Sequence, residues 1–307
     1  MKNNRGYVIV SHSLFLALII LILLPGEKKV QPVYSLLTAV VLMECVYLWK
    51  LVPSIRRGQG AAVPSGIISI LWGVLILWEG AVTKLDCMHP VLYPAPENVF
   101  HVFTAQYQEI AGHVLSTMEL LLLSLVIGMT AGVILGAYIG WNRALSEVLY
   151  PIANVLAPIP SIVYAPYIIS LMPSFRSASA MVIALGTFFP LFLSMVNRVQ
   201  SMDQEIIDSA RMLNVNNTSM VEKIILPYLI PGVIAGLKVT LTTSFMLLMF
   251  AEMMGATKGL GYFIVNYNTY GNYTNVIAGI IVIGVLVSLL NWLVTMLQRY
   301  AIRWKPI

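Results

Sequence analysis

Charged residues are scarce in this sequence. Asp, Glu, Lys and Arg make up only 10% of its 307 residues, and 59% are hydrophobic. Soluble domains carry roughly 25% charged residues, so the composition predicts an integral membrane protein. The formal net charge of +5 comes from lysines and arginines scattered between apolar runs. That distribution favours membrane topology over nucleic-acid binding.

Signatures of metal binding and catalysis are also missing. Cys45 and Cys87 form neither metal-ligand spacing nor a disulfide framework, and the four histidines stand singly. The sequence contains no GxxxxGK[ST] phosphate loop, HExxH, GxSxG or dinucleotide fingerprint. We therefore expect no catalytic residue, no metal site and no cofactor on this chain. If ATP drives it, the nucleotide belongs to another polypeptide.

Apolar runs of about 20 residues are long enough to cross a bilayer core of about 30 Å. They cover 7–24, 33–52, 66–83, 114–140, 148–172, 177–199, 228–254 and 274–298. We expect an all-α polytopic protein with these eight spans. No small-residue cleavage site follows the first run, which predicts a retained helix rather than a signal peptide. An interfacial helix is expected at about 97–107, in a segment that Pro90, Pro94 and Pro96 stiffen.

The positions of Lys and Arg predict that both termini are cytoplasmic. In that orientation twelve of them lie inside: Lys2, Arg5, Lys50, Arg56, Arg57, Arg143, Arg198, Arg211, Lys223, Arg299, Arg303 and Lys305. Five lie outside: Lys28, Lys29, Lys84, Arg176 and Lys258. The linker 56–64 is the best candidate boundary between two N-terminal spans and the rest of the chain.

One polar segment, 201–227, interrupts the apolar chain and is expected on the cytoplasmic side. It predicts two short helices joined at Asn214, with Pro227 closing the second. Capping-box patterns mark both starts: Ser201 with Gln204, and Ser219 with Glu222. The residues predicted to share one apolar face are Ile206, Ala210 and Leu213. A solvated loop is the simpler alternative, but an ordered helix pair at a membrane surface is typical of a docking element.

Glycines recur at every fourth residue of the fourth span: Gly128, Gly132, Gly136 and Gly140. This spacing predicts a smooth face for close packing of another helix, in preference to direct substrate contact. Prolines gather in and after the fifth span: Pro158, Pro160, Pro166 and Pro173. They predict a bent or broken helix, which either lines a pathway or is kinked for packing.

Some acidic and basic residues fall within predicted spans. Glu119 and Glu252 are expected in the outer half of the membrane, and Lys238 in the inner half, where it is able to snorkel. Glu252 serves either structural pairing near an external gate or substrate handling. The sequence assigns no role to Glu44 and Glu79, which lie in the early spans.

The segment around Asp208-Ser209-Ala210 with Asn214, followed by Leu226-Pro227, resembles the "EAA" coupling loop of binding-protein-dependent ABC transporter permeases of the type I importer kind. Other motifs resemble the nitrate/sulfonate/taurine-type group: Pro94-Ala95-Pro96, Ile159-Pro160 with Pro166, Gly186-Thr187-Phe188-Phe189-Pro190, and Ala251-Glu252-Met253 with Gly259-Leu260-Gly261. The resemblance covers about 66–304. It implies a permease domain over 64–307, with the helices in 1–63 as an addition.

The resemblance implies several partners in a bacterial inner membrane: cytoplasmic ATPase subunits, two in number, that carry ATP and Mg, a second permease subunit, identical or different, and an external or periplasmic binding protein. It implies ATPase coupling through Asp208, Ser209, Ala210, Asn214, Leu226 and Pro227. The residues expected near a translocation pathway are Pro160, Pro166, Phe189, Pro190 and Glu252. Asn214 stands where the family has Gly, and Asn is the next-best residue for a left-handed helix stop.

Cargo is not fixed by the resemblance, because the family's Trp-Phe-Gly is replaced by Leu171-Met172-Pro173. A sulfonate, nitrate or taurine-like anion and a thiamine-precursor-like heterocycle both stay open. The alternative function is a secondary transporter driven by an ion gradient, which predicts paired repeats with interrupted helices. A membrane-embedded enzyme would need convergent acid, base or metal residues.

Overall fold

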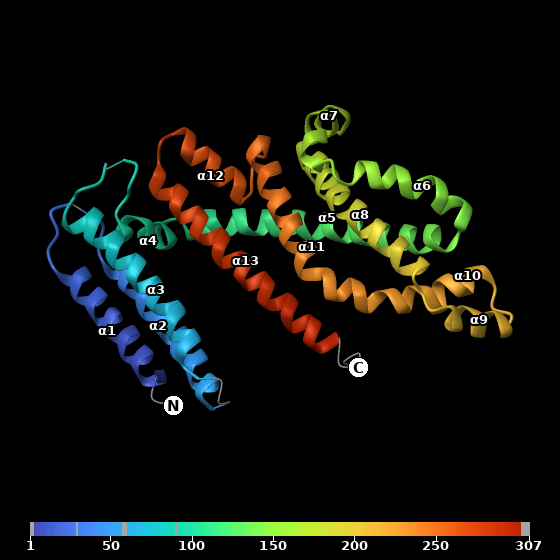
Figure 1. Cartoon of the computed structure of the whole chain (residues 1–307). Coiled ribbons are helices and arrows are strands. Elements are labelled where there is room, and N and C mark those ends of the chain that lie inside the picture. Colours follow the sequence, from blue (N-terminus) through green and yellow to red (C-terminus); the bar gives the residue numbers. More distant parts are fainter. Residues whose placement is uncertain (1–2, 29, 57–59, 90, 302–307) are drawn as a thin grey trace. The chain divides into compact units, whose positions relative to one another are not determined.

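The structure is a computed structural model that describes residues 3–28, 30–56, 60–89 and 91–301 (Figure 1). Its elements are helical, and no β-strand occurs among those residues. Five charges used for the orientation, Lys2, Lys29, Arg57, Arg303 and Lys305, lie outside the described residues, as does Pro90. Within the described ranges, seven helices are long and apolar enough to cross a membrane, or up to eight if one bent pair forms one span. The all-α, polytopic prediction is confirmed.

The chain forms two compact units. The first comprises Met1–Ala111 and Ile264–Ile281, and the second comprises Gly112–Phe263 and Val282–Ile307. Helices α5 (Tyr107–Trp141) and α13 (Tyr273–Ala301) begin in the first unit and continue into the second, whereas α12 (Leu260–Thr269) begins in the second and ends in the first. The predicted boundary between residues 63 and 64 stays a prediction.

In the first unit α1 (Asn3–Leu23), α2 (Tyr34–Arg56) and α3 (Ala62–Glu79) lie side by side (Figure 1). Their core contains Leu18, Val40 and Trp72, all at most 1% exposed. A buried hydrogen-bond chain links the three helices: the Tyr47 hydroxyl lies 3.0 Å from Ser11 Oγ and 2.9 Å from Ser65 Oγ. Such polar links between helices compensate for the weak hydrophobic drive to associate within lipid.

The buried carboxylate of Glu79 forms an ion pair at the end of α3. Glu79 ends α3, its Oε1 pairs with Lys84 Nζ at 3.0 Å, and Lys84 also donates to the Leu24 carbonyl at 2.7 Å. Lys84 lies at the end of the π-helical turn η1 (Gly80–Lys84). The interfacial helix expected at 97–107 is present as α4 (Pro96–Ala105), where buried Glu97 accepts from Thr83 at 3.0 Å. These contacts bind the ends of α1, α3 and α4 together.

In the second unit α8 (Phe175–Gln200) contacts helices on several sides. Its neighbours include α6 (Arg143–Leu156), α7 (Ala165–Leu171) and α11 (Leu226–Gly255). A buried hydroxyl pair, Thr187 and Ser244 at 2.9 Å, links α8 to α11. The core of this unit also takes in residues of α5 and α13, such as Leu121 and Leu290.

The run 148–172 does not form one straight span. It is divided between α6 and a second arm, the 3-10 turn η2 (Ser161–Tyr164) followed by α7, and the two arms meet at 85°. Pro158 and Pro160 lie in the break, where they remove N–H donors and disfavour helix for the residues before them. The bent or broken helix that the proline cluster predicts is therefore present.

Candidate functional site

The polar segment folds as a helix, a tight turn and a second helix. The first helix, α9 (Gln204–Met212), starts after Asp203, whose side chain makes no capping bond. The capping box predicted at Ser201 is wrong: Ser201 ends α8, and its Oγ donates to the Arg198 carbonyl at 3.3 Å. Because α8 is longer than its apolar pattern, Ser201 is used to end a helix rather than to begin one.

Asn214 has φ +52°, in the left-handed region. The N–H of Asn214 donates to the Arg211 carbonyl at 2.9 Å, and the N–H of Val215 reaches back to the Ala210 carbonyl at 3.3 Å. These two bonds are a Schellman motif, which satisfies carbonyls at a helix end. The left-handed stop expected at Asn214 is therefore present, and it separates the two helices within a few residues.

The second helix, α10 (Asn217–Met220), is capped by Asn216, whose Oδ1 accepts from the Ser219 N–H at 2.7 Å. The predicted box of Ser219 with Glu222 is therefore wrong. Pro227 does not close this helix either. The chain runs on through the π-helical turn η3 (Val221–Ile225) into α11, and a helical stretch covers Asn217–Gly255.

Pro227 is tolerated because it lies in the first turn of α11, directly after the π turn. There the Leu226 N–H bonds to the Val221 carbonyl, so the regular α-helical bonding is already shifted before the proline. The second helix of the segment and α11 are consequently one continuous element.

A small apolar core holds the segment against the membrane helices. Ala210 is 4% exposed and packs in a cluster with Met202, Met220 and Ile225. The predicted face of Ile206, Ala210 and Leu213 is wrong at two positions, because Ile206 is 37% and Leu213 79% exposed. With Met212 at 87%, the end of α9 presents two large apolar side chains to the surroundings.

The segment is also tied to the end of α5. The Tyr138 hydroxyl donates to Glu222 Oε1 at 3.2 Å, and Trp141 Nε1 donates to Asn217 Oδ1 at 3.4 Å. Tyr138, Trp141 and Asn217 line an open hollow of about 450 Å³, which Arg211 also lines. Asp208 and Ser209 are exposed on α9, and Asp208 pairs with Arg211 at 3.7 Å.

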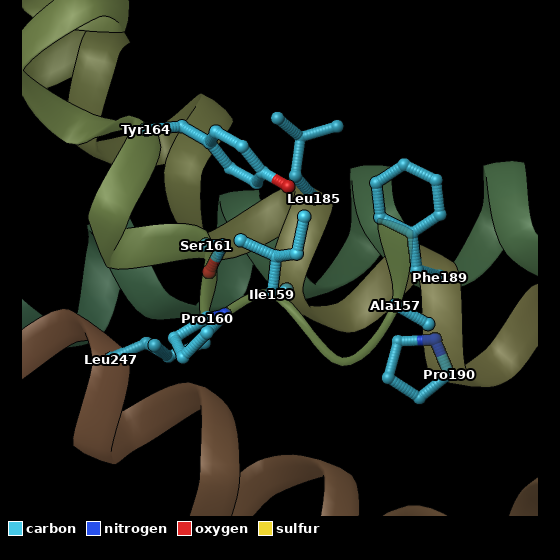
Figure 2. A pocket seen from close by; sticks show the side chains of 10 residues that line it. Ala157, Ile159, Pro160, Ser161, Tyr164, Leu185, Phe189, Pro190 and Leu247 are labelled. Carbon is cyan, nitrogen blue, oxygen red and sulfur yellow. The ribbon is translucent and has the colours of Figure 1, made fainter. Parts of the chain in front are cut away.

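A second site lies where the bent pair meets α8 and α11. Figure 2 shows this cavity, which holds about 120 Å³ and is lined by Ala157, Ile159, Pro160, Ser161, Tyr164, Leu185, Gly186, Phe189, Pro190 and Leu247. It brings together three of the expected pathway residues, Pro160, Phe189 and Pro190. The other two, Pro166 and Glu252, do not line it.

Sequence reasoning missed the polar groups of this pocket. Ser161 follows the predicted break, and Tyr164 ends the short η2 turn. Figure 2 shows the Tyr164 ring directed from its helix toward Ile159 and Leu185. Neither hydroxyl carries a signal in the sequence, because its position depends on the 85° bend and on α8, which follows later in the chain.

The four spaced glycines of α5 all face α8. A Cβ added at Gly128 would lie 2.6 Å from the Ala184 carbonyl oxygen, and one at Gly136 would lie 2.6 Å from Met195 Cβ. At Gly132 and Gly140 the nearest atoms would be 3.1 and 3.0 Å away. These positions let the two helices approach backbone to backbone.

Glu252 is buried, at 2% exposure, within a closed hydrogen-bond network. It accepts from Thr117 Oγ1 at 2.8 Å and from the Gly261 N–H at 2.8 Å. Thr117 in turn accepts from the Leu260 N–H at 2.9 Å. Of the two roles open for Glu252, this geometry favours structural pairing: the carboxylate holds the turn between α11 and α12.

Glu119 and Lys238 lie at the surface of the second unit. Glu119 pairs with Arg176 at 2.6 Å, and both side chains are at least half exposed. Lys238 is exposed on α11. Among the described residues, no cluster of His, Cys, Asp and Glu is arranged to hold a metal ion.

The family described as "Binding-protein-dependent transport system inner membrane component" matches residues 128–304. A Bacillus subtilis permease protein named for aliphatic sulfonates transport, SsuC, is 26% identical over 80% of this chain and 87% of its own. The nitrate import permease protein NrtB of Leptolyngbya laminosa is 25% identical, over 81% and 89%.

The taurine transport system permease protein TauC of Escherichia coli is 26% identical over 77% of this chain and 88% of its own. Among solved structures, an inward-facing MetNI methionine ABC transporter has a chain that matches with a TM-score of 0.51 at 20% identity. That match covers 63% of this chain and 94% of the other. It extends the likeness from sequence to fold.

Proposed function

Because the chain belongs to the family of binding-protein-dependent transport system inner membrane components, we propose that it is the permease subunit of an ATP-driven importer. In this proposal it pairs with a second permease subunit, identical or different, and receives a solute from an external binding protein. Two cytoplasmic ATPase subunits carry the ATP and Mg. Both termini and the segment 201–227 face the cytoplasm, as the positive-inside rule predicts.

The observation that carries the proposal is the turn at Asn214 between two short helices. A Schellman motif, an asparagine cap and a small apolar core fix the two helices relative to each other. The exposed Met212 and Leu213 side chains offer an apolar contact for a partner, flanked by the exposed carboxylate of Asp208. A partner that grips α9 therefore also moves α10 and α11.

The cargo is proposed to be a small solute of the kinds open from sequence. The printed names of three relatives refer to aliphatic sulfonates, nitrate and taurine. A sulfonate, nitrate or taurine-like anion is accordingly the first class, and a thiamine-precursor-like heterocycle the second. The alternative, a secondary transporter, is favoured by no observation within the described residues.

Uptake into proteoliposomes tests the proposal. The full chain is reconstituted with its partner ATPase and binding protein, and solute entry is measured with and without ATP. We expect entry only with hydrolysable ATP. Entry that proceeds without ATP and collapses when the ion gradient is dissipated would instead establish the secondary transporter.

Co-purification tests the coupling segment separately. We expect Asp208→Lys, or removal of residues 212–216, to abolish capture of the ATPase while the chain still inserts into membranes. Glu147→Lys is the matched control, because Glu147 is also an exposed carboxylate paired with an arginine of its own helix, Arg143 at 2.9 Å. Undiminished capture by both segment variants would remove the coupling role.

A further inference from the structure

Two buried hydroxyl groups of the pocket have no hydrogen-bond partner among the residues that the structure describes. They are Ser161 Oγ and the Tyr164 hydroxyl. Ser161 is 5% exposed, and both residues line the cavity of about 120 Å³. A buried unpaired hydroxyl costs about 1–3 kcal/mol. A ligand in this cavity could therefore form hydrogen bonds with both the Ser161 and the Tyr164 hydroxyl groups.

Gly186 keeps the space beside Ser161 open. A Cβ at this position would lie 2.6 Å from Ser161 Oγ and would overlap Leu247 Cδ1. Any side chain here would therefore fill the cavity at the point where the serine hydroxyl is reached. Gly186 lies on α8 and Leu247 on α11, so the cavity depends on all three chain segments around it.

None of the ten residues described as lining the cavity carries a charge. An inorganic oxyanion that leaves water for such a site loses its hydration, which is worth tens of kcal/mol for an isolated ion in an apolar medium. Two hydroxyl donors return only about 1.5–3 kcal/mol each. An uncharged group that accepts or donates a hydrogen bond loses far less on entry. The cavity is thus matched to a neutral group.

We propose that this pocket binds the uncharged part of an organic solute, a ring or short alkyl body with a hydrogen-bonding atom, and excludes inorganic oxyanions. The proposal rests on the importer function above and narrows its cargo to organic solutes. Ser161 and Tyr164 bond to the solute's polar atom, and Phe189 packs against its body. The cavity volume of about 120 Å³ is of the same order as that of an engineered apolar cavity of about 150 Å³ that holds benzene.

Saturation-transfer NMR on the full chain in nanodiscs tests the proposal without ATP or partners. One arm uses 4-aminopyrimidine as a neutral ring, and the other uses butanesulfonate, whose alkyl chain is uncharged. We expect transfer to the ring or alkyl protons at millimolar probe, and no loss of signal when excess nitrate is added. Displacement by nitrate, or no transfer to either probe, would overturn the proposal.

Variants locate the binding. Gly186→Ala is expected to weaken probe binding by about tenfold or more, because its methyl group occupies the cavity. Ser161→Ala and Tyr164→Phe keep the fold and should each weaken binding of the ring by about 3- to 10-fold. Gly284→Ala is the matched control, since a Cβ at this helical glycine of α13 meets nothing within 4 Å. Equal binding by all three pocket variants and the control would place the probes elsewhere and contradict the proposal.

The two proposals fail separately. ATP-dependent uptake of nitrate through the complete transporter, with no probe bound to the chain alone, would leave the importer function standing and remove the pocket. Probe binding that depends on Gly186, together with uptake that is independent of ATP, would support the pocket and remove the importer function.

Discussion

Asn214 holds a backbone conformation, φ +52°, that residues with a Cβ rarely adopt. Glycine adopts it without cost, whereas a β-branched residue pays about 1–3 kcal/mol. We therefore expect Asn214→Val to open the turn between α9 and α10 and to raise the rate of proteolytic cleavage within 212–216 by about tenfold. Limited proteolysis of membrane vesicles measures this rate. Asn214→Gly is the control and should cleave as slowly as the parent; equal rates for Val and Gly would show that the turn is not under this constraint.

Thr117 occupies the centre of the network around Glu252. Its hydroxyl donates to the carboxylate and accepts from the Leu260 N–H. Thr117→Val leaves both groups short of a partner, which should lower the free energy of unfolding by about 1–3 kcal/mol. Thermal unfolding in detergent measures the loss as a fall in Tm.

Thr242→Val is the control for the Thr117→Val variant, because it makes the same substitution at an exposed threonine. Thr242 is exposed on α11 and donates to the Lys238 carbonyl of its own helix at 2.9 Å. Surface substitutions of this kind alter stability by only about 0.5 kcal/mol. If the two valine variants unfold at the same temperature, Glu252 does not depend on Thr117.

The structural roles of single residues differ in how far they can be predicted from the sequence. The left-handed conformation of Asn214 is predictable, because a helix end of this kind requires Gly or Asn, and Asn214 is such a residue at the expected position. The roles of Ser161 and Tyr164 are not predictable, since a hydroxyl side chain has no preferred structural setting. Their burial without a partner arises from contacts with α8 and α11, distant in sequence. Glu252 is predictable as a charge within an apolar span, but its partner Thr117 has no signal in the sequence.

At the scale of elements, the four spaced glycines let α5 pack closely against α8. Gly136→Ala would place a methyl 2.6 Å from Met195 Cβ and 3.0 Å from the Phe192 carbonyl oxygen. The helices must then separate, and overpacking of this kind costs about 1–3 kcal/mol. We expect a lower Tm in detergent for this variant.

Gly112→Ala on the same helix is the matched control, because a Cβ there meets nothing within 4 Å. It should match or exceed the parent in stability, since alanine favours helix by about 1 kcal/mol over glycine. A fall in Tm for both variants would mean that glycine serves backbone flexibility along α5 rather than packing.

Element boundaries were less predictable than the elements themselves. The apolar runs located the long helices because hydropathy over about 20 residues is a strong signal. The capping patterns at Ser201 and Ser219 failed because neighbouring residues, Asp203 and Asn216, occupy the cap positions instead. Pro227 does not end the helix, because a π turn, which has no clear sequence signature, directly precedes it.

At the scale of the whole molecule, the orientation is open to a direct measurement. Cys87 is exposed, in the loop between α3 and α4 that is expected outside, whereas Leu213 is 79% exposed in the segment expected inside. A membrane-impermeant maleimide should label Cys87 in intact cells. In a Cys87→Ser background, Leu213→Cys should react only after the membrane is permeabilised. Labelling of Leu213→Cys in intact cells would reverse the topology and detach the segment from any cytoplasmic ATPase.

The core shared by α1, α2 and α3 also bears on how the chain is made. All of its residues lie between Val8 and Phe103, so none waits for a later part of the sequence. Ribosomes add about 5–20 residues each second, and the first domain folds first. The leading helices can therefore pack against one another in the bilayer before the later transmembrane helices are made, while about two thirds of the polypeptide is still untranslated.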